Sequence, residues 1–304
     1  EAEARPNLKV ITGAQVTRVL FEGKRAAGLR YIVNGKFTDV LAKRAVILSA
    51  GSIGSPHLLL LSGVGPKAEL QKHGVEVIHE LPGVGENLQD HLDIVVCTKA
   101  KNRLPMSMHP LSLLRAIVGL LKYLLFRTGE YTSNVAEVGA FLKTDPKEPV
   151  PDLQWHFVPL ANAYHGLDLT LVLKHYAYLV MCCDLRPLSR GRITLASGDP
   201  LKPPQIDPNW GSHERDIEKL VIGIKKMREV LAQKAFDPHR GIEMEPGADC
   251  KTDEQLREWV RRKAEAIYHP VGTCKMGADS DPMAVVDAQL RVRGLQNLRV
   301  VDAS

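Results

Sequence analysis

The chain has 304 residues, of which 44% are hydrophobic and 25% are charged, and its formal net charge at pH 7 is +5. This composition is typical of a soluble globular protein with material for one large domain or two ordinary ones. No run of Lys and Arg is dense enough to indicate a nucleic-acid partner. The five cysteines are irregularly spaced without any CxxC, so we expect a reduced compartment, no disulfide framework and no metal site.

The N-terminal part of the chain is predicted to form short strands. β-Branched runs separated by glycine-containing turns occupy residues 8–11, 15–21 and 27–33. Asn34-Gly35 follows the last of these runs, as in a two-residue hairpin turn. A mostly apolar run over 44–50 then ends at Gly51, which is typical of a buried parallel strand.

A helix is predicted next, beginning at Ser55-Pro56 and continuing through Leu61. Serine is a favoured N-cap and proline a favoured first helical residue. A strand, a glycine turn and a helix N-terminus together suit a phosphate or a cofactor. The sequence contains neither GxGxxG nor a P-loop, so this unit alone does not identify a nucleotide.

Residues 111–126 are mostly apolar and are interrupted by Arg115 and Lys122. The segment is too short and too charged to span a bilayer, which takes about 20 apolar residues. A buried helix or a lid is the first interpretation. A basic, leucine-rich helix that lies on a membrane surface is the alternative.

From Pro151 the pattern predicts an antiparallel sheet. Its expected strands occupy 153–158, 176–185 and 191–195. A helix beginning near Ser212 follows, and its apolar residues recur at helical spacing. They are Ile217, Leu220, Val221, Ile224, Met227 and Leu231.

A second helix is predicted to begin at Thr252, where Gln255 completes a capping box, and to run to Tyr268. Pro270 disfavours helix for the residue before it, so His269 should leave the helix and project. Histidine titrates close to neutral pH and can act as a general base there. A structural histidine at a helix end is the alternative. Strands at 289–292 and 298–302 end the chain.

Four segments resemble signatures of the glucose–methanol–choline (GMC) flavoprotein oxidoreductases. In chain order they are GSIGSPHLLLLSGVGP (51–66), GVGENLQDH (83–91), YHPVGTCKMG (268–277) and VVDAS (300–304). They span nearly the whole chain in the family's order, and they look most like the bacterial alcohol dehydrogenases and choline dehydrogenases. The resemblance implies an α/β (α+β) fold. In it, part of an FAD-binding Rossmann-like domain (1–96 and 268–304) accompanies an antiparallel-sheet substrate-binding domain with helices (97–267).

The resemblance also implies a reaction. A primary alcohol would be oxidised to an aldehyde, His269 accepting the hydroxyl proton while the α-hydride moves to N5 of FAD. An alkoxide is a far better hydride donor than a free alcohol, so this chemistry needs a positioned base. Choline dehydrogenation is one alternative. A non-catalytic substrate-domain or binding module without flavin is another.

The resemblance assigns roles to ten residues. His269 would be catalytic, and Tyr268 and Gln154 would bind substrate. The cofactor-binding set would be Val16, Ala50, Gly51, Asn87, His91, Asp302 and Ala303. The alternative is core packing for Tyr268, a core or surface position for Gln154, an ordinary strand position for Val16, and a turn for Asn87 and His91.

Two family features are missing from the sequence: the dinucleotide-binding GxGxxG, and a second active-site histidine or asparagine that would lie beyond Ser304. The resemblance therefore implies a piece of a longer subunit that is inactive by itself. Its electron acceptor would be a quinone or another carrier. Its location would be cytoplasmic, with a peripheral contact at the inner membrane through 111–126 if the acceptor is a quinone.

Overall fold

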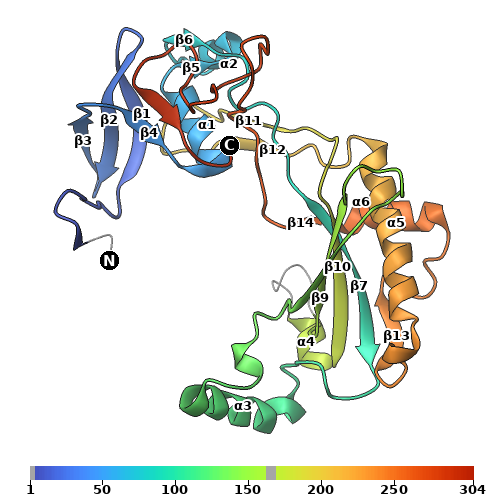
Figure 1. Cartoon of the computed structure of the whole chain (residues 1–304). Helices are drawn as coiled ribbons and strands as arrows, with labels where there is room; N and C mark the ends of the chain where they lie inside the picture. Colours follow the sequence, from blue (N-terminus) through green and yellow to red (C-terminus); the bar gives the residue numbers. More distant parts are fainter. Residues whose placement is uncertain (1–3, 162–168) are drawn as a thin grey trace. The chain divides into compact units, whose positions relative to one another are not determined.

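The computed structural model describes residues 4–161 and 169–304, and the chain folds into two units (Figure 1). Unit 1 comprises Glu1–Asp90, Arg190–Trp210 and His269–Ser304, and unit 2 comprises His91–Ser189 and Gly211–Tyr268. Helices and strands are mixed and an antiparallel sheet is present, which confirms the predicted α/β (α+β) class.

The segment 190–210 belongs to unit 1, although the predicted middle domain included it. Gly191 and Leu88 exchange backbone hydrogen bonds, and the Ile193 amide donates to Gly85. These pairings join residues about a hundred positions apart along the chain, so no local pattern indicates them. The division into domains at 1–96, 97–267 and 268–304 stays a prediction.

Unit 1 contains a three-stranded antiparallel sheet. Its strands, in sheet order, are β1 (Gln15–Glu22), β2 (Arg25–Val33) and β3 (Lys36–Leu41). Asn34 and Gly35, which link β2 to β3, have φ values of 49° and 75°, as a type I′ turn requires, so the predicted hairpin is confirmed. Residues 8–11 are exposed and lie outside any strand, so the strand predicted there is wrong.

The rest of unit 1 is built on two short parallel strands, β4 (Val46–Leu48) and β15 (Leu298–Val300). The predicted parallel strand is therefore present, but Ile47 is 56% exposed, so β4 is buried on one face only. The predicted strand at 289–292 is reduced to isolated bridges. The remaining elements are α1 (Gly51–Leu61), β5 (Val64–Gly65), α2 (Lys67–Lys72), β6 (His79–Glu80), β11 (Arg192–Thr194) and β12 (Gln205–Asp207).

Helix α1 begins at Gly51, so the predicted start at Ser55-Pro56 is wrong. The Ser55 hydroxyl accepts a hydrogen bond from the Ala50 amide, 3.0 Å away, from inside the helix. Pro56 consequently lies within the helix instead of at its first position. The local capping pattern was misleading because glycine with a φ of 75° starts the helix earlier.

Unit 2 is organised around an antiparallel sheet with the strand order β13-β7-β10-β9-β8, and β14 also pairs with β7. The strands are β7 (Leu92–Ala100), β8 (Val138–Leu142), β9 (Leu153–Val158), β10 (Ala177–Asp184), β13 (Arg240–Glu245) and β14 (Glu265–Ala266). The predicted antiparallel sheet is thereby confirmed for 153–158 and 176–185. The third strand predicted for it, 191–195, is wrongly placed, because β11 pairs with β12 in a two-stranded sheet of unit 1. Its centre, β10, is almost wholly buried, Cys182 and Cys183 included.

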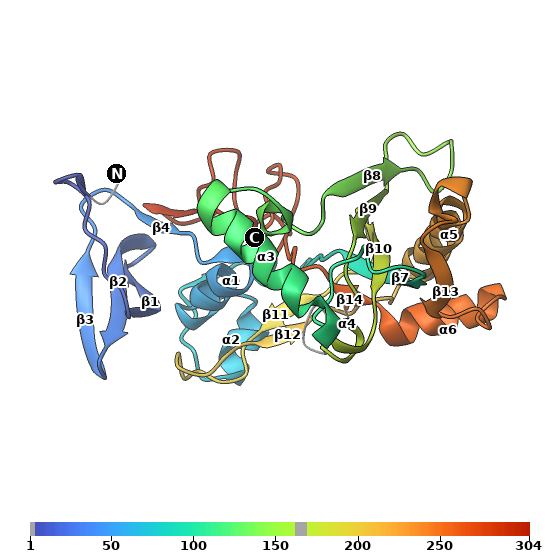
Figure 2. The ribbon, with the colours of Figure 1, turned by 90° about the horizontal axis from the view of Figure 1, so that it is seen from below.

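Helix α5 (Glu214–Leu231) packs on β7 and β10, and α6 (Asp253–Lys263) packs beside α5 in both views (Figure 1 and Figure 2). All six apolar residues predicted for the inner face of α5 are buried. The capping box of Thr252 and Gln255 is formed. However, α6 ends at Lys263 and the chain then enters β14, so His269 does not lie at a helix end as predicted.

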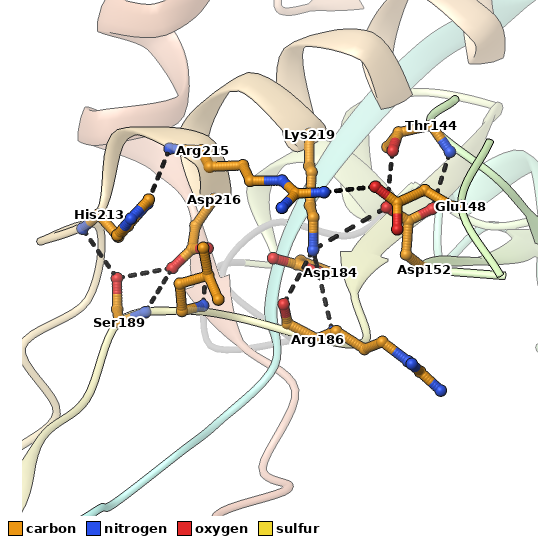
Figure 3. A network of polar contacts seen from close by, with 11 residues as sticks. Thr144, Glu148, Asp152, Asp184, Arg186, Ser189, His213, Arg215, Asp216 and Lys219 are labelled. Atoms are coloured by element: carbon orange, nitrogen blue, oxygen red, sulfur yellow. Dashed lines mark hydrogen bonds and ion pairs between the residues drawn. The ribbon is translucent and has the colours of Figure 1, made fainter. Parts of the chain in front are cut away.

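A buried polar network fastens α5 to the sheet (Figure 3). Lys219 Nζ lies 2.9 Å from Asp184 Oδ1 and 3.9 Å from Asp152 Oδ2, and all three side chains are at most 5% exposed. Asp216 accepts hydrogen bonds from the amide and the hydroxyl of Ser189. Burial raises the pKa of Asp184, and the Lys219 hydrogen bond opposes that effect. The charges are tolerated because they are paired and hydrogen-bonded.

The other helical segments of unit 2 are η2 (Pro110–Ser112), α3 (Leu113–Phe126), η3 (Glu130–Thr132), α4 (Thr170–Lys174) and η5 (Lys234–Phe236). The first interpretation of 111–126 as a buried helix is wrong within the described chain, because most of α3 is exposed. Of the helices at 4–161 and 169–304, none has both the length and the apolarity to cross a bilayer.

Candidate active site

His269 lies on an exposed loop of unit 1 that follows β14. The preceding residue, Tyr268, has a φ of 64°, which is unusual for a bulky residue, and its side chain is 69% exposed. The carboxylate of Asp90 accepts a hydrogen bond of 3.0 Å from the His269 amide. This contact fixes the backbone at the residue that the sequence singled out as a base.

Two hydrogen bonds fasten the same loop to the first turn of α1. The hydroxyl of Ser52 donates to the carbonyl of Pro270, and the hydroxyl of Thr273 donates to the carbonyl of Ser52, each at 2.6 Å. Ser52 and Thr273 are both buried. The loop is therefore held on both sides of Val271 by one serine.

Asn87 supports the loop from a third direction. Its Nδ2 donates to the Gly272 carbonyl at 2.9 Å, and its Oδ1 accepts from Arg190. Gln89 and Val271 also exchange two backbone hydrogen bonds. Gly272 has a φ of 93°, and a Cβ on it would lie 2.8 Å from Asn87 Nδ2. Only glycine tolerates this positive φ and also leaves room for Asn87.

The loop connects in turn to the end of β15. The Gly272 amide donates to the Ala303 carbonyl at 3.1 Å. Asp302 Oδ2 accepts from the Gly51 amide at 2.9 Å and from the Ser55 hydroxyl at 2.5 Å. Burial favours the neutral acid, but hydrogen bonds from Ser304, Ser55 and the Gly51 amide outweigh burial and lower the pKa of this carboxyl.

These contacts build one cluster at the carboxyl ends of β4 and β15. Ligands of open α/β sheets bind outside the carboxyl ends of parallel strands. Ala50, Asp302 and Ala303 are exposed, and a Cβ built on Gly51 would meet no atom within 4 Å. Ala50, Gly51 and Ala303 have small side chains or none, so a flat ring system can approach the backbone there. This part of unit 1 therefore fits a nucleotide cofactor such as FAD. Among the described residues, no three or more His, Cys, Asp or Glu side chains cluster in a way that could hold a metal ion.

The structure thus brings together six of the predicted site residues. They are His269, Ala50, Gly51, Asn87, Asp302 and Ala303. Val16 lies in β1 opposite Tyr31 and belongs to the three-stranded sheet instead.

Three predicted residues belong to unit 2. The His91 carbonyl accepts the Ile267 amide at 3.1 Å. Gln154 lies in β9 opposite Cys183 of β10. Tyr268 is the last residue of unit 2, directly before His269.

The sequence analysis did not single out Ser52, Asp90 or Thr273, and it assigned Ser55 only to a helix cap, although all four lie within the recognised segments. One signal was available. A proline inside a helix leaves the carbonyl four residues earlier without its donor, and Pro56 therefore indicates that Ser52 needs another partner.

Comparison with known proteins identifies the class. Residues 1–93 and 187–304 match two family models, both described as GMC oxidoreductase. The chain is 45% identical over 302 residues to the alcohol dehydrogenase [acceptor] of Pseudomonas putida, covering 99% of this chain and 54% of that protein. It is 44% identical over 312 residues to an oxygen-dependent choline dehydrogenase of the same species, and that match covers 100% of this chain and 53% of the dehydrogenase.

The chain therefore belongs to the GMC oxidoreductase family, as the four segments predicted. It spans about half the length of these curated relatives. Among solved structures, a formate oxidase of Aspergillus oryzae studied for its FAD modification superposes with a TM-score of 0.88 at 25% identity. That match covers 100% of this chain and 57% of the oxidase. The comparisons support FAD as the cofactor, as predicted.

Proposed function

We propose that the full-length protein carrying this chain uses FAD to oxidise a primary alcohol to an aldehyde. The alcohol and choline dehydrogenases that resemble the chain support the substrate class. One observation carries the proposal. The loop of His269 is hydrogen-bonded to Asp90, to Ser52 of α1 and to the end of β15, where a flavin nucleotide fits.

In this proposal the imidazole of His269 accepts the hydroxyl proton of the alcohol. A positioned general base contributes about 10²–10⁴-fold to a rate. Bound FAD supplies the redox chemistry by accepting the α-hydrogen with its electron pair, which leaves the aldehyde. The chain's own part is to hold the base in place, because a loop that moved by 1 Å would lose much of that rate.

The residues proposed to hold the cofactor are those at the ends of β4 and β15, with further contacts from β1 and the segment before β7. They are Ala50, Gly51, Asn87, Asp302, Ala303, Val16 and His91. Tyr268 and Gln154 are proposed to bind substrate. The exposed ring of Tyr268 directly precedes His269, so it is the more direct of the two candidates.

Choline is the alternative substrate, supported by the similarity to choline dehydrogenases. A quaternary ammonium is bound by aromatic faces, and Tyr268 could supply one of them. Quinone or another carrier is the proposed electron acceptor, with a peripheral membrane contact through 111–126 and a location at the cytoplasmic side. The 304 residues alone contain no GxGxxG, and we propose that they turn over no alcohol by themselves.

A substrate panel on the full-length protein tests the proposal. Primary aliphatic alcohols, aromatic alcohols and choline are compared with an artificial acceptor and with oxygen, and the flavin absorbance is recorded first. We expect flavin in the purified protein and acceptor reduction by a primary alcohol. A protein without flavin would support a non-catalytic binding module and contradict the proposal. Preference for choline would favour the alternative substrate.

A further inference from the structure

Helix α3 carries the largest group of exposed apolar side chains in the described part of unit 2. Nine large residues of this helix are between 42% and 74% exposed: Leu113, Leu114, Ile117, Val118, Leu120, Leu121, Leu124, Leu125 and Phe126. Monomeric proteins rarely expose an apolar patch of more than a few hundred Å² without a partner for it. This feature has no role in the alcohol oxidation proposed above.

The helix is oriented so that its apolar arc faces away from its own unit. Gly119 is buried against Tyr131, because a Cβ on Gly119 would lie only 2.9 Å from that ring. Arg115 lies near the same side and pairs with Glu130 at 2.5 Å. An ordinary surface helix buries its apolar stripe and exposes its polar residues, and α3 does the reverse.

The exposed apolar surface begins before the helix. Leu104, Met108 and Leu111 are 61%, 58% and 62% exposed. Together with the nine residues of α3 they make twelve exposed large apolar side chains over 104–126, which we call the α3 surface.

The charged side chains within residues 101–129 are all of one sign. Residues 101–129 contain no Asp or Glu, and their basic residues are Lys101, Arg103, Arg115, Lys122 and Arg127. Arg115 is neutralised by Glu130. Lys122 and Arg127 are exposed. An apolar arc bordered by cations is complementary to an anionic lipid surface, where both the acyl chains and the headgroups find partners.

The length of α3 decides how it would meet a bilayer. Fourteen residues at 1.5 Å each extend about 21 Å, which is shorter than the hydrocarbon core of about 30 Å. A helix of this length and composition lies in the interface with its apolar arc in the acyl boundary.

We propose that the α3 surface binds an anionic lipid bilayer, with α3 lying in the interfacial plane and Lys122 and Arg127 at the level of the lipid phosphates. This names the lipid class for the peripheral contact proposed above, and it rests on that part of the proposal. Vesicle binding is measured without any alcohol, so its failure would leave the proposed oxidation untouched.

The test is co-sedimentation of the full-length protein with vesicles of phosphatidylglycerol and with vesicles of phosphatidylcholine alone. We expect at least a 10-fold preference for phosphatidylglycerol, weakening as salt rises because exposed charges are screened. The double variant Leu121→Glu/Leu125→Glu should bind the anionic vesicles at least 10-fold more weakly. Both side chains are exposed, so the thermal unfolding temperature should stay unchanged and report an intact fold.

The matched control is Val138→Glu/Ile242→Glu, which adds the same two negative charges at exposed apolar residues of β8 and β13 in unit 2. It should leave vesicle binding unchanged. Failure to bind phosphatidylglycerol vesicles would overturn the proposal, as would binding that Leu121→Glu/Leu125→Glu does not affect. A dimer that dissociates in that variant would show that a second copy covers the surface instead.

Discussion

The hydroxyl of Thr273 donates a hydrogen bond of 2.6 Å to the carbonyl of Ser52, at the position where α1 lacks a donor of its own. Pro56 has no amide hydrogen and lies four residues after Ser52. The side chain on the histidine loop therefore completes the helix, and the helix holds the loop. The pairing is local to unit 1, yet it joins segments 221 residues apart in the sequence.

Thr273→Val should remove this donor at nearly constant volume. The buried Ser52 carbonyl would be left unsatisfied, and we expect a loss of about 1–3 kcal/mol in the free energy of unfolding. Because the loop also carries His269, alcohol oxidation should fall more than flavin content. Thr273→Ser keeps the hydroxyl and should restore most of both. Denaturant unfolding and steady-state kinetics of the full-length protein check this; equal defects in the two variants would contradict it.

Gly272→Ala should distort the loop, because both the backbone conformation and the neighbouring Asn87 exclude a side chain at this position. The φ of 93° is unfavourable for alanine, and its Cβ would meet Asn87 at 2.8 Å. We expect a loss of about 1–3 kcal/mol in unfolding free energy, together with reduced turnover.

The matched control for that variant is Gly74→Ala. Gly74 has a φ of 68° but nothing within 4 Å of the added Cβ, so only the backbone strain of about 1 kcal/mol is expected. Turnover should be unchanged in this control. If Gly272→Ala cost no more than Gly74→Ala, the close approach of Asn87 would not matter.

Asp302→Asn should change how stability depends on pH. The folded-state pKa of Asp302 lies below its usual value, so the ionised carboxylate stabilises the fold above the unfolded-state pKa of about 4. That contribution is lost as pH falls through the lowered folded-state pKa. The wild type should therefore be more stable than Asp302→Asn at pH 7, and the difference should shrink towards pH 3. Urea unfolding at both pH values measures it, and a difference that grew at pH 3 would contradict the assignment.

Lys219→Met should destabilise unit 2, because it leaves the buried carboxylates of Asp184 and Asp152 without their cation. Breaking a buried pair in this way costs about 3–5 kcal/mol. Lys225→Met removes the same charge from the same helix, but its pair with Asp253 is exposed, so little change is expected. Thermal unfolding of the two variants side by side checks the difference.

Local patterns predicted those elements whose signals lie within a few residues. The Thr252 and Gln255 capping box and the inner face of α5 are of this kind, because cap chemistry and helical spacing are local. The start of α1 was wrongly predicted from an equally local signal, Ser55-Pro56. There a contact with Asp302, 247 residues away, outweighs the capping preference.

The residues of the candidate site also fall into those that local patterns predict and those that only the fold explains. His269, Asn87 and Asp302 could be predicted, because they lie in segments that resemble the family's signatures. Pro56 indicates that the Ser52 carbonyl needs a donor from elsewhere, but Thr273 could not be predicted as that donor. Their pairing joins two segments that only the fold brings together. The exposure of α3 could be predicted only in part. Its composition predicts a helix, but only its neighbours decide which side is covered.

The most direct test of the account is anaerobic reduction of the bound flavin by an alcohol in a single turnover of the full-length protein. Flavin bleaching in His269→Gln should be slower than in the wild type by about 10²–10⁴-fold at equal flavin content. His79→Gln, a partly buried histidine of β6 in the same unit, should reduce its flavin at the wild-type rate. A wild-type rate in His269→Gln would contradict the central claim that this loop holds the base.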